Sequence, residues 1–128
     1  MILLLDTSTP ICRITFIDGD WSVTENWESG RELAKGLLAH LEQYLGKYNK
    51  AWDDLTGLVA FKGPGSFTGL RIGITVLNSL AYARNLPIVG ETGNDWQTQG
   101  VQRLQRGEND EIVLPEYGAE ANITQPRK

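Results

Sequence analysis

Hydrophobic and polar positions follow two different periods along the chain, and the change of period separates predicted strands from predicted helices. Residues 2–5 form a continuous apolar run that ends at Asp6, a pattern typical of a central strand covered on both faces. Residues 12–17 and 21–27 are largely alternating, and each segment follows a turn rich in small and polar residues. Together the three segments predict an antiparallel meander.

Two longer segments, residues 31–48 and 69–84, instead repeat apolar side chains every three or four positions and predict helices. Apolar strands are predicted before the second helix, at residues 57–61, and after it, at residues 88–90, beyond the helix-breaking Pro87. The predicted order is therefore β-β-β-α-β-α-β, which defines an α/β fold with flanking helices.

The rest of the chain has weaker patterns. Residues 93–106 predict a short helix that closes the sheet, and residues 111–114 predict a last strand or an extended segment. With 128 residues the chain has the length of one domain, which we place at residues 1–114. Residues 115–128 hold little apolar surface, and we expect a partly flexible tail there.

Both main helices carry more apolar surface than one sheet needs to cover, because each has two apolar rows on different sides. We expect the helices to lie side by side and to present a joint apolar surface that a partner's helix pair completes. The alternative is that another helix of the same chain covers this surface. The rows are Leu33, Leu37, Leu41 and Tyr44 with Ala34, Leu38, Leu41 and Leu45 in the first helix, and Leu70, Ile74, Leu77 and Ala81 with Ile72, Val76, Leu80 and Ala83 in the second.

Glycine, proline and hydroxyl residues are concentrated at the start of residues 62–73, between a predicted strand and the second helix. They predict a sharp turn in which the hydroxyl of Ser66 or Thr68 caps the helix. Free N–H groups at a helix start bind anions. However, Gly69 is not followed by the Lys-Ser or Lys-Thr of a P-loop, and Thr68 stands where a dinucleotide-binding motif has its third glycine. The spacing thus favours a structural or docking turn over a phosphate cradle.

Four segments, which follow one another along the chain in the expected order, resemble the TsaB (YeaZ-like) family, which serves tRNA threonylcarbamoyladenosine synthesis. They are GPGSFTGLRIG at residues 63–73, LLDTST at residues 4–9, the Arg-Glu pair at residues 31–32, and NLPIVG at residues 85–90. The resemblance covers roughly residues 1–92. It implies a single actin-like ATPase (ASKHA) lobe with a mixed five-stranded sheet, and the second lobe of usual members looks deleted here.

The resemblance also implies a function: a non-catalytic scaffold subunit that binds a TsaD-like catalytic subunit through its two main helices. Gly69 and Gly73 would let another helix approach closely, so we expect that side of the helix to meet the partner. Replacing Gly73 by Glu would then abolish binding in a folded chain, whereas an inward-facing Gly73 would make the same change unfold it. The predicted partner-binding residues are Leu33, Leu37, Gly65, Phe67, Thr68, Gly69, Leu70, Arg71, Gly73 and Leu77.

Catalytic chemistry has few candidates in this sequence. Asp6, Thr7 and Ser8 resemble the first phosphate loop of actin-like ATPases, but the favoured interpretation is a vestigial loop whose side chains satisfy their own backbone. His40 is the only histidine and lies within a helix, which favours a packed or surface histidine over a base or ligand. Cys12 is the only cysteine, and we expect it to be buried. No catalytic residue and no metal ligand is predicted.

The net charge of −4 argues against a protein that holds nucleic acid by itself. We therefore expect tRNA to be bound only indirectly, and ATP and a metal to sit on partner subunits rather than on this chain alone. The expected partners are a TsaD-like subunit, a TsaE-like ATPase, and a second copy when the partner is absent. No signal peptide or membrane span is predicted, which indicates a cytoplasmic protein. The alternative function is a stand-alone nucleotide- or phosphate-binding ASKHA module or enzyme.

Overall fold

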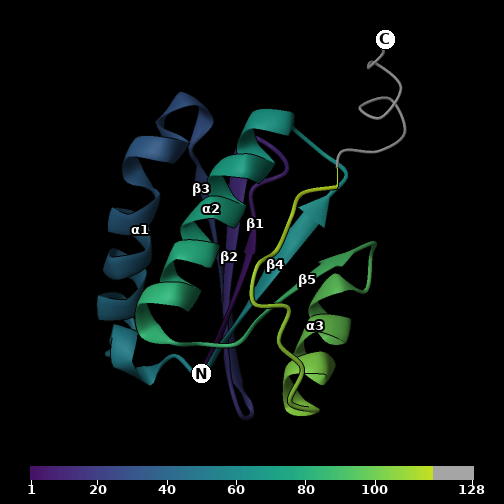
Figure 1. Cartoon of the computed structure of the whole chain (residues 1–128). Helices are drawn as coiled ribbons and strands as arrows, with labels where there is room; N and C mark the ends of the chain where they lie inside the picture. The colour runs from purple at the N-terminus through teal and green to yellow at the C-terminus, as the bar shows by residue number, and fades with distance from the viewer. Residues whose placement is uncertain (117–128) are drawn as a thin grey trace, which may run out of the picture.

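The computed structural model describes residues 1–116, which form a mixed five-stranded sheet in the order β3-β2-β1-β4-β5 with helices on both faces (Figure 1). Two short 3-10 turns, Gly30–Glu32 and Trp52–Asp54, precede α1 and β4. The predicted order of strands and helices is confirmed. The strands are β1 Ile2–Asp6, β2 Ile11–Asp18, β3 Trp21–Glu28, β4 Gly57–Gly63 and β5 Ile88–Thr92, and the helices are α1 Leu33–Lys47, α2 Phe67–Arg84 and α3 Trp96–Gln105.

Strand pairing follows from the connections. Tight turns join β1 to β2 and β2 to β3, and both pairs are antiparallel, as the predicted meander requires. The helical crossovers through α1 and α2 return the chain in the same direction, so β4 pairs parallel to β1 and β5 parallel to β4. Because β1 is central and both faces of the sheet are covered, Leu3, Leu4 and Leu5 are at most 2% exposed.

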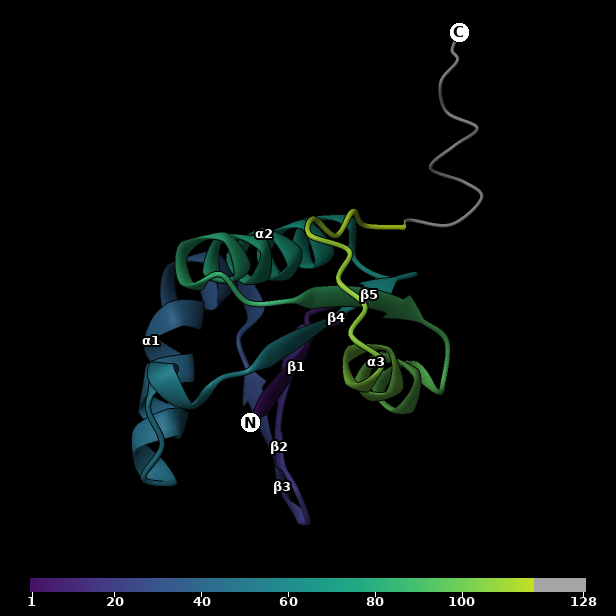
Figure 2. The ribbon, with the colours of Figure 1, turned by 60° about the horizontal axis from the view of Figure 1, so that its bottom comes forward.

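The sheet separates two apolar layers. The helices α1 and α2 cover one face, and α3 covers the other face over β4 and β5 (Figure 2). Successive residues of β1 point to opposite faces, so Leu3 and Leu5 pack into the larger core while Leu4 joins Val59, Val89 and Trp96 in the smaller one. The second layer explains why the predicted helix after β5 forms: its Trp96 is only 6% exposed.

Residues 107–116 run back over the sheet. For residues 111–114 the prediction was a last strand or an extended segment, and no strand forms there. Asn78 of α2 holds this segment, because its side-chain amide donates to Val113 O and accepts from Val113 N, both at 2.9 Å. The N–H of Glu116 donates to Lys62 O at 2.8 Å. The predicted tail, residues 115–128, lies almost wholly outside the described residues. Within residues 1–116 no helix is long and apolar enough to cross a membrane.

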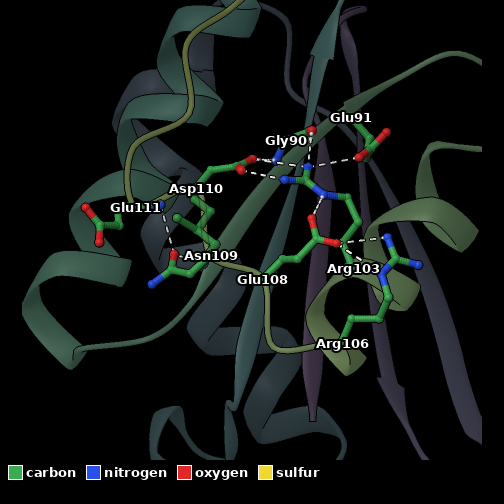
Figure 3. Close-up of polar contacts among 9 residues, drawn as sticks. Gly90, Glu91, Arg103, Arg106, Glu108, Asn109, Asp110 and Glu111 are labelled. Carbon is green, nitrogen blue, oxygen red and sulfur yellow. Dashed lines mark hydrogen bonds and ion pairs between the residues drawn. The ribbon is translucent and has the colours of Figure 1, made fainter.

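Arg103 of α3 anchors the start of this segment (Figure 3). Its guanidinium forms ion pairs with Glu91 at 2.9 Å, Glu108 at 2.7 Å and Asp110 at 2.5 Å. The hydrogen bonds from Arg103 lower the pKa of Glu108. Burial alone would raise the pKa of Asp110, but its hydrogen bonds from Arg103 and the Gly90 N–H outweigh burial, and the net pKa is lowered.

Acid is therefore expected to destabilise the protein partly through Glu108 and Asp110. Both pKa values are lower in the folded chain than in the unfolded one, so their contribution is present above the ordinary carboxyl pKa and is lost as pH falls through the folded value. Lys62 acts on Asp110 in the same direction. Urea unfolding between about pH 6 and pH 3 should show a smaller loss for Asp110→Asn than for the parent. Equal losses would show that the Asp110 ion pair adds nothing.

Candidate docking site

The junction between β4 and α2 is the turn that the sequence singles out. The N–H of Gly69 donates to Ser66 Oγ at 3.2 Å, so Ser66 is the helix cap. The helix begins at Phe67, two residues earlier than predicted. At its other end Asn85 adopts the left-handed conformation that commonly ends helices, with φ of 56°. The predicted strand-turn-helix junction is confirmed.

A second turn, between β1 and β2, is hydrogen-bonded to this junction. Thr7 is 2% exposed, and its hydroxyl donates to Gly69 O at 2.7 Å. The N–H of Ser66 donates to Ser8 O at 2.8 Å. The carboxyl ends of the parallel neighbours β1 and β4 thus lie side by side, and hydrogen bonds join the two turns.

The glycines of α2 serve this contact inside the chain. A Cβ atom on Gly73 would lie 2.2 Å from Thr7 Oγ1, and one on Gly69 would lie 2.3 Å from Thr7 O. A Cβ on Gly65 would lie 2.4 Å from the Cβ of Ser8. The expectation that the Gly69 and Gly73 side meets a partner helix is wrong, because that side is occupied by the β1–β2 turn.

The first-loop residues are engaged in the same way. Asp6 Oδ1 accepts a hydrogen bond from the N–H of Ser8 at 2.8 Å, which is an Asx turn. The Thr7 hydroxyl is already hydrogen-bonded to Gly69 O. These contacts favour the structural interpretation of Asp6, Thr7 and Ser8 over a phosphate loop, because a nucleotide would have to compete with bonds that already exist.

The predicted partner-binding residues divide by exposure. Five belong to the interior, and their side chains are unavailable to a partner, so these assignments are corrected: Leu33, Leu37, Leu70, Gly73 and Leu77. Their apolar rows are the ones that face the sheet. Gly69 is intermediate. The exposed members are Gly65, Phe67, Thr68 and Arg71, with the Arg71 guanidinium 5.2 Å from the centre of the Phe67 ring.

The two main helices do lie side by side (Figures 1 and 2), but less apolar surface remains outside than expected. Ile72, Val76 and Leu80 are half-buried against the larger core. On α1 the second predicted row includes Leu38, whose side chain is 52% exposed. The joint surface is therefore narrower than the sequence pattern indicates.

Two adjoining hollows mark this surface near the starts of both helices. One has a volume of about 310 Å³ and is lined from both helices and both turns, and the other, of about 280 Å³, is lined by α2. Thr68 and Ile72 line both of them. Arg31, Ile72 and Thr75 were not among the predicted partner-binding residues, although Arg31 belongs to the family motif and Ile72 to an apolar row. We define the docking surface as Arg31, Leu38, Phe67, Thr68, Arg71, Ile72 and Thr75.

The remaining reactive side chains are packed. The His40 ring stacks on Trp27 with centroids 3.7 Å apart, and Nδ1 lies 3.1 Å from Gly36 O, which confirms a packed histidine. Cys12 is fully buried, and burial together with the nearby Asp6 carboxylate raises its pKa to about 12. Among residues 1–116, no cluster of three His, Cys, Asp or Glu side chains is placed to hold a metal ion.

The sheet order and the two fastened turns define one lobe of the actin-like ATPase type. A solved structure from Pseudomonas aeruginosa, described as similar to peptidase YeaZ, superposes with a TM-score of 0.69 at 28% identity, over 82% of this chain and 49% of that chain. A second structure, YeaZ from the same organism, gives 0.68. The likeness covers half of those proteins and confirms the predicted lobe.

The family model described as TsaD, tRNA N6-adenosine threonylcarbamoyltransferase, matches residues 28–101, so the chain belongs to this family. Within it the chain is a TsaB (YeaZ) homologue. The tRNA threonylcarbamoyladenosine biosynthesis protein TsaB of Escherichia coli is 33% identical over 103 residues, which are 80% of this chain and 44% of that protein. A Listeria monocytogenes tRNA N6-adenosine threonylcarbamoyltransferase is 40% identical over 62 residues, 48% of this chain and 18% of that enzyme. The chain spans about half the length of its TsaB relatives.

Proposed function

We propose that the chain is a non-catalytic scaffold subunit in the cytoplasmic synthesis of tRNA N6-threonylcarbamoyladenosine. In this role it binds a TsaD-like catalytic subunit through the docking surface on α1 and α2. The observation that supports the proposal most is the match to TsaB relatives over 80% or more of the chain. The family model matches residues 28–101, which include the turn before α2 and the helix pair that carry the docking surface.

A TsaD-like partner is supported by the sequence similarity of this chain to both kinds of protein. The chain matches both TsaB proteins and a threonylcarbamoyltransferase, so each partner has a related lobe with a related helix pair. Two such pairs can meet about a pseudo-two-fold axis and bury their exposed apolar residues together. The same geometry accounts for pairing with a second copy when the partner is absent.

The side chains of the lobe support the assignment of catalysis to the partner subunits. Asp6, Thr7 and Ser8 are engaged in the turns, and His40 is stacked. ATP, the metal and the transfer chemistry would then belong to the partner subunits, including a TsaE-like ATPase. The net charge of −4 supports tRNA binding by the partner rather than by this chain.

Reconstitution tests the proposal directly. The TsaD-like subunit and the other components from the same cell are combined with and without this chain, and modified tRNA is measured by mass spectrometry. We expect modification to fall at least about tenfold without the chain, because a scaffold acts by holding the catalytic subunit in a competent arrangement. Unchanged modification together with no binding of the TsaD-like subunit would refute the proposal.

The isolated chain is expected not to bind ATP tightly, because Asp6, Thr7 and Ser66 already form hydrogen bonds within the two turns. Calorimetry with ATP and magnesium should give a dissociation constant weaker than about 100 μM, or no heat at all. A dissociation constant in the micromolar range or tighter would instead favour the nucleotide-binding alternative. The variant Asp6→Asn then serves as the control, since loss of that affinity would locate the nucleotide at this loop.

A further inference from the structure

The outer edge of β5 is hydrogen-bonded at Ile88 and Gly90, although no sixth strand follows it within residues 1–116. In a strand the N–H and C=O of alternate residues point to the same side, and Ile88 and Gly90 are the outward residues in the first part of β5. Ile88 N donates to Asn109 Oδ1 at 3.0 Å, and Ile88 O accepts from Asp110 N at 2.7 Å. Gly90 N donates to Asp110 Oδ2 at 2.9 Å, and Gly90 O accepts from Arg103 Nη1 at 3.1 Å. All four groups are satisfied, and Figure 3 shows the bonds of Gly90 to Asp110 and Arg103.

Most of these partners are side chains. Residues 108–113 therefore occupy the place of a sixth strand without having strand conformation. An uncovered edge strand pairs readily with other chains, and proteins commonly cover or blunt such edges. Here the cover depends on Asn109, Asp110 and Arg103. A backbone strand would have supplied the same four bonds by itself.

The middle of the cover lies at the surface, while its end is anchored by Val113, which is 3% exposed in the larger core. Residues 109–112 are exposed, with Ile112 67% exposed. Glu111 adopts a left-handed backbone conformation with φ of 68°, which is unfavourable for a residue other than glycine. The cover is held by the ion pairs of Arg103 with Glu108 and Asp110, and by the two hydrogen bonds between the Asn78 amide and the Val113 backbone.

We propose that residues 108–113 are a displaceable cover, and that the uncovered β5 edge pairs antiparallel with β5 of a second copy of this chain. The inference does not depend on the proposed function. It assigns a second interaction surface, at the β5 edge of the sheet, separate from the docking surface on α1 and α2.

A second copy fits because the edge is self-complementary. With a two-fold axis at Val89, Ile88 of one copy faces Gly90 of the other. An antiparallel pair of this kind exchanges both N–H···O bonds. The two such pairs satisfy the same four groups in each copy that the cover satisfies now. The interface would be isologous and closed, which is the commonest symmetry of protein dimers.

The first test measures opening of the edge by amide hydrogen exchange in the full chain. Asp110→Ala removes the acceptor of Gly90 N–H and an Arg103 partner, so we expect the Gly90 amide to exchange at least about tenfold faster. The control Glu111→Ala removes a neighbouring carboxylate that makes no bond to β5, and it should leave Gly90 unchanged. If Asp110→Ala fails to fold, Asn109→Ala is measured in the same way at Ile88.

The second test identifies the partner strand. Across the two-fold axis the two Val89 residues form a non-hydrogen-bonded pair with Cα atoms about 4.5 Å apart, a separation that accepts a disulfide. Under mild oxidation Val89→Cys combined with Asp110→Ala should therefore form a covalent dimer. Val89→Cys combined with Glu111→Ala should form at least about tenfold less. Cys12 lies on β2, between β3 and β1 and away from the β5 edge, so Asp110→Ala alone should form none.

Fast Gly90 exchange together with the Val89→Cys cross-link supports the proposal. Unchanged exchange in Asp110→Ala would show that the cover is not held by this residue, and the proposal fails. Fast exchange without a cross-link would show an opened edge that does not accept a second copy, which also overturns it. Equal cross-linking in the Glu111→Ala background would overturn the role of the cover.

Discussion

Replacing Gly73 by Glu is expected to unfold the domain. A Cβ atom at this position would lie 2.2 Å from the Oγ1 of Thr7 and 2.7 Å from its Cγ2. Thr7 cannot move aside freely, because it is buried and its hydroxyl donates to Gly69 O. The glutamate would also place a charge in the interior without a cation to pair with, at a cost of several kcal/mol, about 3 to 5 in total. Circular dichroism and urea unfolding measure the loss.

Two variants separate burial of this site from a general effect of charge on α2. Thr75→Glu places the same side chain two residues along the helix, where it is exposed, and should keep a stability within about 0.5 kcal/mol of the parent. Gly73→Ala adds only the clashing methyl group and should cost about 1–3 kcal/mol. A Gly73→Glu chain with parent-like stability would mean that the two turns separate easily, contrary to their hydrogen bonds.

Hydrophobic periodicity predicted the elements well because each pattern reports on a local conformation. The continuous apolar run of β1 indicated a strand buried on both faces, and Leu3 to Leu5 are buried accordingly. The two amphipathic segments became α1 and α2 within two residues of their expected ends. Such features need only the sequence of the element itself.

The outward side of each helix could not be predicted from periodicity. In α2 two apolar rows have the same spacing, and only tertiary packing decides that Leu70 and Leu77 face the sheet while Ile72 lies toward the docking surface. Gly69 and Gly73 did indicate a close approach, but the sequence does not name the approaching group. It is the β1–β2 turn of the same chain, some sixty residues earlier.

The Arg103 cluster escaped prediction for the same reason. Its carboxylates come from β5 and from the segment after α3, and they meet only because that segment turns back across the sheet edge. Gly107, with φ of 83°, permits this reversal. The Gly-Glu-Asn-Asp sequence at residues 107–110 is typical of an ordinary polar turn.

Replacing Leu38 by Glu is expected to abolish binding of the TsaD-like subunit while the domain stays folded. Leu38 is 52% exposed on α1, so the substitution removes little packing within the chain. In the proposed complex the same position is buried between helix pairs, where an unpaired carboxylate loses its hydration. We expect an affinity at least about 100-fold weaker, which corresponds to about 2.7 kcal/mol. Calorimetry or a pull-down with the TsaD-like subunit measures it.

The matched control for Leu38→Glu is Gln105→Glu, which adds the same charge on α3, on the opposite face of the sheet. It should bind the TsaD-like subunit as the parent does, and both variants should unfold at the parent's urea concentration. If Gln105→Glu weakens binding equally, net charge rather than position controls the interaction. If Leu38→Glu binds normally, the partner does not use the α1 side of the docking surface. In that case Phe67 and Arg71, which lie together at the start of α2, become the residues to change next, because their exposed pair is the other part of that surface.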